Sequence, residues 1–145
     1  MRYKRILFIC TGNICRSPMA QALLAEALPS DAGYTIESAG LRGLDGQPAH
    51  ALAIKVMAEN KIDLSRHRAR TVSPDLLRQA DLILAMENAQ KMWIESKMST
   101  VVGRVHLLDR ESNQDIGDPM GGAYGDFNST FEVINDCLDH WIPVL

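Results

Sequence analysis

The sequence predicts an α/β fold in three layers, with a four-stranded parallel sheet between helices on both faces in a doubly wound arrangement. Short apolar runs alternate along the chain with segments of helical periodicity, and strands that alternate with helices form parallel sheets. The strand expected over residues 3–10 is apolar almost throughout, which is typical of a central strand covered on both faces. A short glycine-bearing loop then connects this strand to an Ala/Leu-rich helix.

The first half of the chain alternates two strands with two helices. Ser17 is a favourable N-cap, and Pro18 suits the first helical position, where a missing N–H leaves no hydrogen bond unmade. In the second helix the residues Leu52, Val56 and Met57 form an apolar stripe with helical spacing. The expected elements are a strand over 3–10, a helix over about 18–28, a strand over 34–38 and a helix that begins at Pro48 and closes at Asn60.

The second half of the chain contains three more helices and two more strands. Ser73 and Pro74 repeat the pattern of a cap followed by proline, and Ser129 with Glu132 has the spacing of a capping box for the last helix. No repeat, linker or low-complexity tract is visible, so residues 1–145 are expected to form one domain. The expected elements are a helix from Pro74 to about Ala80, a strand over 81–86, a helix over 87–95, a strand over 105–108, a loop over 109–126 and the final helix.

Composition, charge and cysteine count indicate a globular protein and argue against a nucleic-acid-binding, membrane-inserted or disulfide-rich one. The chain has 145 residues, 46% of them hydrophobic and 23% charged, which is typical of a soluble globular protein. A net charge of −3 gives no reason to expect nucleic acid or an anionic membrane as a partner. No signal peptide is expected from the N-terminal residues, and the apolar runs are too short to predict membrane insertion. Three cysteines make a poor disulfide framework, so a reducing cytoplasm is the expected compartment.

The stretch CTGNICRSP, residues 10–18, carries the expected chemistry. Cys10 ends the first strand, at the edge where open α/β sheets bind their ligands. The amides of the loop and the N-terminus of the next helix should converge there and favour a tetrahedral oxyanion, and Arg16 adds a planar fork for two of its oxygens. A thiol in such surroundings ionises readily and becomes a nucleophile for phosphorus. The alternative is that Cys10 is a small buried apolar residue and Arg16 a surface cation.

Displacement of an alcohol or phenol from phosphorus also requires an acid. The loop after the fourth strand leaves the same edge of the sheet as Cys10 and offers the candidates Asp109, Glu111, Asp115 and Asp118. Asp118 is the best candidate among them, because Pro119 restricts its backbone to extended conformations. The alternative is a solvated aspartate at the start of a turn. No cluster has the spacing of metal ligands, so neither a metal nor a cofactor is expected.

The stretch over residues 10–18 resembles the phosphate loop of the low-molecular-weight protein tyrosine phosphatases. Other segments follow in that family's order, namely Ser38-Ala39-Gly40, residues 67–70, residues 81–86 and Asp118-Pro119. The resemblance implies a phosphotyrosine phosphatase I-like fold and the hydrolysis of phosphotyrosine monoesters in proteins through a phosphocysteine intermediate. It also implies inhibition by phosphate-like oxyanions.

The resemblance assigns roles to individual residues. Cys10 is the nucleophile, Arg16 holds the equatorial phosphate oxygens, and Asp118 is first an acid and then a base. Ser17 is expected to donate its hydroxyl to the Cys10 sulfur. Asn13, which tolerates a positive φ, is expected to hold the strained turn with support from Ser38 and His67. The residues expected to contact substrate are Thr11, Gly12, Asn13, Ile14, Cys15, Ser17 and Leu44.

Cys15 has two interpretations. It either packs in the core, or forms a disulfide with Cys10 that protects the nucleophile at a recoverable oxidation level, and the resemblance favours the disulfide. Cys137 lies on a helical stripe and is expected in the core.

The rim of the site departs from the eukaryotic members of the family. No aromatic pair follows Pro119, and Leu44 stands where those members carry an aromatic residue. Leu44 with residues 38–41 resembles the bacterial branch, which implies a tyrosine autokinase as a protein partner. Tyr124 is a candidate for the missing ring, although a loop tyrosine is more often partly packed.

Other functions remain open. A protein arginine phosphatase of the same fold carries Thr in place of Ile14, but residues 118–122 resemble that branch. A thiol-dependent arsenate reductase needs a further cysteine pair, and residues 81–95 contain none. A non-catalytic phosphotyrosine binder would be favoured by loss of Cys10, Arg16 or Asp118, all of which are present. A redox or metal role for the two loop cysteines is a last alternative.

Overall fold

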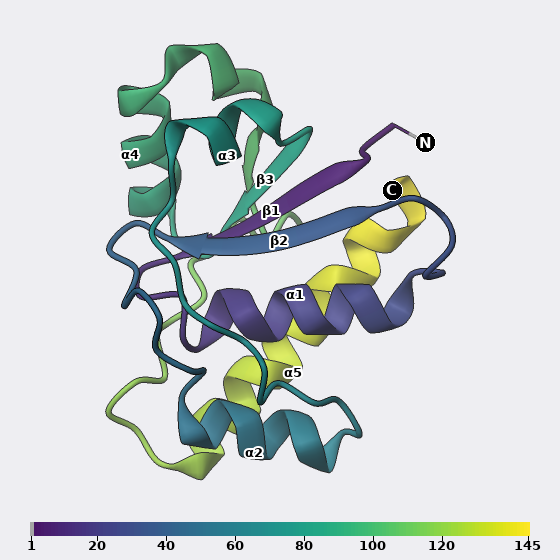
Figure 1. Ribbon diagram of the computed structural model, residues 1–145, viewed down its shortest axis with the longest axis vertical. Coiled ribbons are helices and arrows are strands. Elements are labelled where there is room, and N and C mark those ends of the chain that lie inside the picture. The colour runs from purple at the N-terminus through teal and green to yellow at the C-terminus, as the bar shows by residue number, and fades with distance from the viewer. Residues whose placement is uncertain (1) are drawn as a thin grey trace.

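A computed structural model describes residues 2–145 and contains a four-stranded parallel sheet with the strand order β2-β1-β3-β4. The α/β fold predicted from the sequence is therefore confirmed (Figure 1). The strands are β1 (Arg5–Cys10), β2 (Thr35–Gly40), β3 (Leu82–Ala85) and β4 (Val105–Leu107). The helices are α1 (Arg16–Ala27), α2 (Ala51–Glu59), α3 (Pro74–Gln79), α4 (Asn88–Lys97) and α5 (Tyr124–Trp141), with short 3-10 helices η1 (Ser99–Arg104) and η2 (Ile142–Val144).

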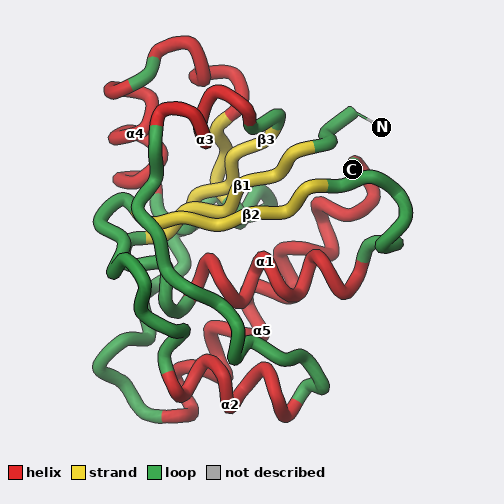
Figure 2. Tube along the Cα trace, viewed as in Figure 1, coloured by secondary structure: helices red, strands yellow, loops and turns green. Residues whose placement is uncertain are grey.

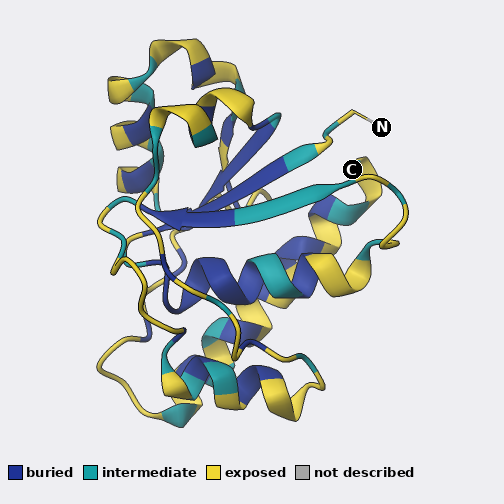
Figure 3. Cartoon of the chain, viewed as in Figure 1, coloured by how far each residue is buried: buried dark blue, intermediate teal, exposed yellow. Residues whose placement is uncertain are grey.

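The helices cover both faces of the sheet. Helices α1 and α5 lie on one face with α2 beyond them, and α3 and α4 lie on the other (Figure 1). Side chains of β1 alternate between the two sides, as the period of a strand requires. Ile6, Phe8 and Cys10 join the core under α1 and α5, whereas Leu7 and Ile9 join the core under α3. Strands β1 and β3 are accordingly buried along almost their whole length, whereas the first half of β2 is only partly buried (Figure 3).

The loops that follow the strands meet at one edge of the sheet (Figure 2). Strand β1 pairs with β2 on one side and β3 on the other, so that Cys10 lies opposite Gly40 and Ile9 opposite Ala85. After β1 the chain forms β2 on one side of β1, and it then forms β3 on the opposite side. The strand order therefore reverses at the carboxyl end of β1. Such a topological switch point is the usual ligand site of open α/β sheets. The Cys10 loop (residues 10–16) leaves the sheet at this point.

Two helices in the first half begin at residues other than those predicted. Helix α1 begins at Arg16, not near Pro18, and Ser17 is not its cap, because the Ser17 hydroxyl bonds to the Cys10 loop. Helix α2 begins at Ala51, not at Pro48, because Pro48 pairs with Arg68 in an isolated antiparallel bridge. His50 caps α2, and its Nδ1 accepts a hydrogen bond from the Leu52 N–H at 3.1 Å.

The predicted start of the last helix is wrong. Helix α5 begins at Tyr124, so Ser129 and Glu132 lie inside it instead of forming a capping box. Asp126 fulfils that function, because its Oδ2 accepts a hydrogen bond from the Ala123 N–H at 2.8 Å and its charge favours a helix N-terminus. The predicted cap of α3 is confirmed, since Ser73 Oγ accepts a hydrogen bond from the Leu76 N–H at 3.2 Å. Helix η1 has no counterpart among the predicted elements.

Within residues 2–145, no helix combines the length and the apolar character that crossing a membrane requires.

Candidate active site

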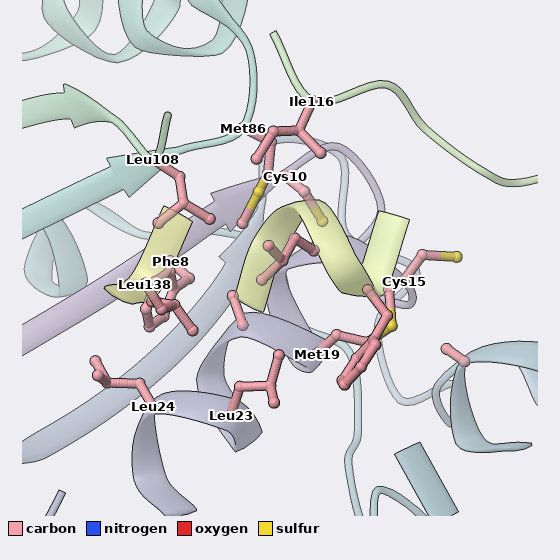
Figure 4. Close-up of a cluster of buried hydrophobic side chains, with 14 of the residues drawn as sticks. Phe8, Cys10, Cys15, Met19, Leu23, Leu24, Met86, Leu108, Ile116 and Leu138 are labelled. Carbon is pink, nitrogen blue, oxygen red and sulfur yellow. The ribbon is translucent and has the colours of Figure 1, made fainter. Parts of the chain in front are cut away.

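Cys10 is placed at the carboxyl end of β1, where its side chain is almost fully buried. Its Sγ lies 2.9 Å from Ser17 Oγ in the first turn of α1. Asn13 Nδ2 donates a hydrogen bond to the same Ser17 oxygen at 2.8 Å, which leaves the Ser17 proton available for the sulfur. Figure 4 shows Cys10 and Cys15 among the buried side chains on the α1 side of the sheet. The cysteine sulfur thus has a polar partner inside an apolar layer.

Asn13 holds the Cys10 loop in a conformation that few residues adopt. Its φ is 61°, in the left-handed region, where asparagine is one of the few tolerated non-glycine residues. Its Nδ2 also donates to Ser38 Oγ at 2.9 Å, and its Oδ1 accepts from the Arg70 N–H at 3.0 Å. The Asn13 carbonyl lies 2.7 Å from His67 Nε2. The loop is therefore tied to β2 and to residues 67–70.

His67 is a neutral hydrogen-bond donor in this arrangement. A carbonyl oxygen only accepts, so the nitrogen that faces Asn13 carries the proton. Burial lowers the pKa of His67, and the nearby Arg68 and Arg70 add to that effect, while the bond to Asn13 opposes it. The ring is consequently held uncharged near neutral pH.

Arg16 lies beneath the loop and is 1% exposed. Its Nη1 donates to Glu87 Oε2 and, at 2.7 Å, to the carbonyl of Ile116. Its Nη2 lies 3.6 Å from Asp118 Oδ2. Its Nε is buried and has no hydrogen-bond partner among residues 2–145. A buried charged group with an unpaired donor is costly, so this guanidinium is suited to an anion that would complete its bonding.

Two polar residues at the start of α4, which sequence reasoning did not identify, position Arg16. Besides binding Arg16, Glu87 Oε2 accepts a hydrogen bond from Gln90 Nε2 at 3.3 Å. Gln90 is 4% exposed, and its Nε2 also donates to Thr11 Oγ1 at 3.1 Å. Its Oε1 accepts from the backbone N–H of Glu87 at 2.9 Å. The signal in the sequence was the position of these residues, directly after a buried strand at the same sheet edge as Cys10.

Asp118 is carried by a loop that is fastened to the β3–α4 connection. The Ile116 N–H donates to the Met86 carbonyl at 2.8 Å, and Asp115 Oδ1 accepts from the Asn88 N–H at 2.7 Å. Asp118 lies two residues after Ile116. Its side chain is 43% exposed, and its Oδ2 faces the Arg16 guanidinium. The loop thus holds a carboxyl group at the mouth of the site, in contact with solvent.

These segments enclose one cavity of about 250 Å³. Arg42 and Met120, which the sequence did not indicate, complete its lining. Tyr124 does not reach the cavity, because its hydroxyl donates to Glu59 and its ring packs under Lys55 of α2. The predicted residues that line the cavity are Cys10, Thr11, Gly12, Ile14, Cys15, Arg16, Leu44 and Asp118.

Four other predicted site residues lie outside the lining of the cavity. Asn13 and Ser17, expected among the substrate contacts, are fully buried, and their side chains bond to the loop and to each other. Ser38 and His67 lie behind the loop, as residues that support Asn13 would. Across residues 2–145, His, Cys, Asp and Glu side chains do not gather in groups of three or more that could hold a metal ion.

Cys15 is held in its neutral form. Burial raises the pKa of Cys15 to about 12, and the negative charges of Asp118 and Cys10 add to the effect, while Arg16 opposes it. Cys15 is therefore a neutral thiol at physiological pH. Because a thiol is a far weaker nucleophile than a thiolate, Cys15 is poorly suited to act as a nucleophile.

Comparison with known proteins places this geometry in a family. The family model for low molecular weight phosphotyrosine protein phosphatase matches residues 5–145. The probable low molecular weight protein-tyrosine-phosphatase EpsP of Ralstonia nicotianae is 44% identical over 140 residues, which cover 97% of this chain and 94% of EpsP.

Solved structures of this family are similar to the structure of this chain. Vibrio vulnificus Wzb in complex with benzylphosphonate superimposes with a TM-score of 0.92 at 32% identity, over 99% of both chains. The YwlE arginine phosphatase from Geobacillus stearothermophilus superimposes with a TM-score of 0.87 at 31% identity, over 93% of this chain and 88% of YwlE. From the match along nearly its whole length, the chain belongs to the low-molecular-weight phosphotyrosine protein phosphatase family.

Proposed function

We propose that this protein is a tyrosine phosphatase that hydrolyses phosphotyrosine monoesters in proteins, with Cys10 as the nucleophile. The observation that carries the proposal is the convergence of Cys10, Arg16 and Asp118 on one cavity, although Asp118 is remote in sequence from the other two. Membership of the family supports the same conclusion. So does the complex of Vibrio vulnificus Wzb with benzylphosphonate, because that ligand joins an aromatic ring to a phosphonate group.

In the first step the Cys10 thiolate attacks phosphorus, and a sulfur–phosphorus bond forms as the bond to the tyrosyl oxygen breaks. Asp118 donates its proton to that leaving oxygen. Arg16 holds the equatorial oxygens, on which transition-state charge is spread, through the donors that are free of Glu87 and Ile116.

In the second step Asp118, now a carboxylate, removes a proton from a water molecule, whose oxygen attacks phosphorus. The sulfur–phosphorus bond breaks, phosphate leaves, and Cys10 returns as a thiolate. The Ser17 hydroxyl at 2.9 Å stabilises this departing sulfur by donating a hydrogen bond. Each proton and each bond in the two steps is thus assigned to a side chain of the cavity or to water.

The walls of the cavity favour a flat ring. Ile14, Leu44 and Met120 present apolar surface beside Cys10. A phenyl ring packs against such walls without leaving polar groups unpaired, whereas a guanidinium would lose hydrogen bonds there.

A protein arginine phosphatase is the second candidate. The similarity to YwlE and the sequence of residues 118–122 favour it. Ile14 opposes it, because a side chain at this position that hydrogen-bonds would suit phosphoarginine better.

The cellular setting follows from the chemistry. A reactive thiolate requires a reducing compartment, so we place the enzyme in the cytoplasm, acting on a phosphoprotein such as a bacterial tyrosine autokinase. Phosphate-like oxyanions are expected to inhibit it by occupying the donors of Arg16. Oxidation of Cys10 is expected to end in a disulfide with Cys15, its neighbour in the cavity wall.

Turnover of p-nitrophenyl phosphate in the presence of EDTA tests the proposal. The parent protein should be active without metal, Cys10→Ser should be inactive, and Asp118→Ala should lose about 10²–10⁴-fold in kcat, the usual contribution of a general acid. Full activity in Cys10→Ser would contradict the mechanism. Phosphotyrosine and phosphoarginine peptides then distinguish the two candidates, and faster turnover of phosphoarginine would favour the second.

A further inference from the structure

A second cavity, of about 310 Å³, adjoins the active-site cavity and has no role in the mechanism above. The two cavities share Thr11 and Arg42, so a ligand that leaves the first along this side enters the second. Helix α4 supplies the opposite wall with Ala89, Gln90 and Trp93. We call this second cavity the α4 cavity.

Arg42 stands at the boundary between the two cavities on a rigid backbone. Its N–H donates to the Thr11 carbonyl at 2.9 Å, which ties it directly to the Cys10 loop. At the next residue, Gly43, an added Cβ would lie 2.4 Å from the Arg70 backbone, so the two segments are in close contact. The Arg42 side chain is exposed, and no carboxylate among residues 2–145 forms an ion pair with it.

The charge that the α4 cavity offers to a ligand is positive. Its only carboxylate among the described residues, Glu87, is already bound by Arg16 and Gln90. The Arg42 guanidinium has no such partner among the same residues. A second cation, Lys97 Nζ, lies 5.7 Å from the centre of the Trp93 ring. An anionic group is therefore the favoured occupant.

Trp93 gives the α4 cavity an apolar wall, and packing within the fold does not explain why this side chain is exposed. The residue is 40% exposed and belongs to a helix whose buried side chains are Gln90 and Ile94. Exposed tryptophan is unusual on a free surface and common where a partner is bound. Leu44 and Met120, at the rim of the active-site cavity, are also exposed large apolar residues. Exposed apolar side chains are thus present at both cavities.

On these grounds, and given the proposed phosphatase function, we propose that the α4 cavity binds an acidic residue next to the phosphotyrosine of the protein substrate. The carboxylate of that residue pairs with the Arg42 guanidinium, and its hydrocarbon stem packs on the Trp93 ring. The enzyme accordingly selects phosphotyrosine sites that carry a flanking Asp or Glu.

Phosphotyrosine peptides that differ only in a Glu, Gln or Lys at the position before or after phosphotyrosine test this selection. For the parent protein, kcat/KM should be about 2- to 5-fold higher with Glu than with Lys on one side, the range that an exposed ion pair supplies, and the ratio should shrink with added salt. Arg42→Gln should bring the ratio close to one, and Arg42→Glu should invert it. Arg66→Glu, which changes an exposed arginine outside both cavities by the same charge, should leave the ratio unchanged.

Trp93→Ala separates the α4 cavity from the chemical step. Because p-nitrophenyl phosphate is too small to reach beyond the active-site cavity, its turnover should be unchanged, while kcat/KM for the Glu peptide should fall several-fold. Equal Glu and Lys rates in the parent, or a ratio that responds equally to Arg42→Glu and Arg66→Glu, would overturn the inference while leaving the phosphatase intact.

Failure of the proposed function would look different, because p-nitrophenyl phosphate itself would not be hydrolysed. Binding of the same peptides to the Cys10→Ser protein, measured by fluorescence anisotropy, reports the preference without turnover. Tighter binding of the Glu peptide would support the inference there, and equal binding of the Glu and Lys peptides would overturn it.

Discussion

At the scale of single residues, the site depends on buried polar side chains whose hydrogen bonds are satisfied by one another. Asn13 is the clearest case, since it bonds to Ser17, Ser38 and the Arg70 backbone while holding a positive φ. Aspartate would tolerate the same backbone but could not donate to the two serines. The amide is therefore required for its donors as well as for its conformation.

His67 should make stability depend on pH. Its folded-state pKa is lowered, so the folded protein binds this proton less readily than the unfolded chain does. The stabilisation is complete above the unfolded pKa of about 6.5 and is lost as pH falls below it toward the lowered folded value. Denaturant unfolding at pH 7.5 and pH 5.5 should show a smaller loss of stability in His67→Gln, which donates to Asn13 but does not titrate.

His106 provides the comparison for this experiment. Its pKa is also lowered, chiefly by burial, so His106→Gln should remove a second part of the same pH dependence. Because glutamine at position 67 keeps the donor to the Asn13 carbonyl, neither substitution should disturb phosphatase turnover. An identical pH dependence in the parent and His67→Gln would contradict the assignment of His67.

At the scale of elements, the site exists because the ends of three strands pack directly against the Cys10 loop. At Gly40, the last residue of β2, an added Cβ would lie 2.4 Å from the Thr11 carbonyl and 3.0 Å from the Asn13 nitrogen. Both neighbours are backbone atoms of the Cys10 loop, which cannot rotate away as a side chain would. Glycine at this position is thus a requirement of the active site as well as of the strand.

Gly40→Ala should therefore lower kcat strongly, by about 10²-fold or more, because a displacement of roughly 1 Å in a catalytic group has that effect. Gly103→Ala is the matched control, since nothing lies within 4 Å of a Cβ there. Steady-state kinetics and thermal unfolding of both variants would show whether the loss is specific to the loop. Equal activity in the two variants would contradict the close contact.

Gln90 tests how α4 controls Arg16. Gln90→Glu keeps the acceptor for the Glu87 N–H but, when ionised, loses the donor to Thr11 and repels the Glu87 carboxylate. We expect kcat to fall by about 10- to 100-fold, as the loss of hydrogen bonds to a charged group predicts, with partial recovery at acid pH where the new carboxyl is protonated. Gln114→Glu, on the exposed loop, should leave the pH profile of kcat unchanged. A Gln90→Glu profile that matches the parent would exclude this positioning role.

At the scale of the whole molecule, the site is held by elements that lie far apart in the sequence. The core under α1 and α5 surrounds Cys10, while α4 and the loop before α5 bind Arg16 from beyond β3. Occupation of the site by an anion should therefore stabilise the entire fold and not only the loop.

Inorganic phosphate should raise the midpoint of thermal unfolding as its concentration increases. At a concentration 100 times Kd, a ligand that binds only the folded state adds about 2.7 kcal/mol of stability. Arg16→Lys, which keeps the charge but loses the planar fork, should show a much smaller shift. Chloride at equal ionic strength is the control, and a shift of the same size with chloride would exclude specific binding.

Local sequence was sufficient to predict the fold class and, through its motifs, the family. Apolar runs of strand length, helical stripes and the spacing from Cys10 to Arg16 are properties of neighbouring residues, so they predict a β-loop-α unit without knowledge of the rest of the chain. Helix starts were predicted less well, because Ser17 and Pro48 form tertiary contacts instead of the local ones that their residue types favour.

Tertiary structure alone decided what surrounds those residues. Glu87 and Gln90 meet the Cys10 loop only because β3 lies beside β1. Arg42 and Trp93 face one cavity only because β2 ends and α4 begins at the same edge of the sheet. Contacts between residues so distant in sequence depend on strand order and register. The periodicity of individual segments in one sequence predicts neither. The Cys10 loop is thus local in sequence, whereas the approach of Asp118 to this loop and the support of Arg16 by Glu87 arise from the packing of the whole domain.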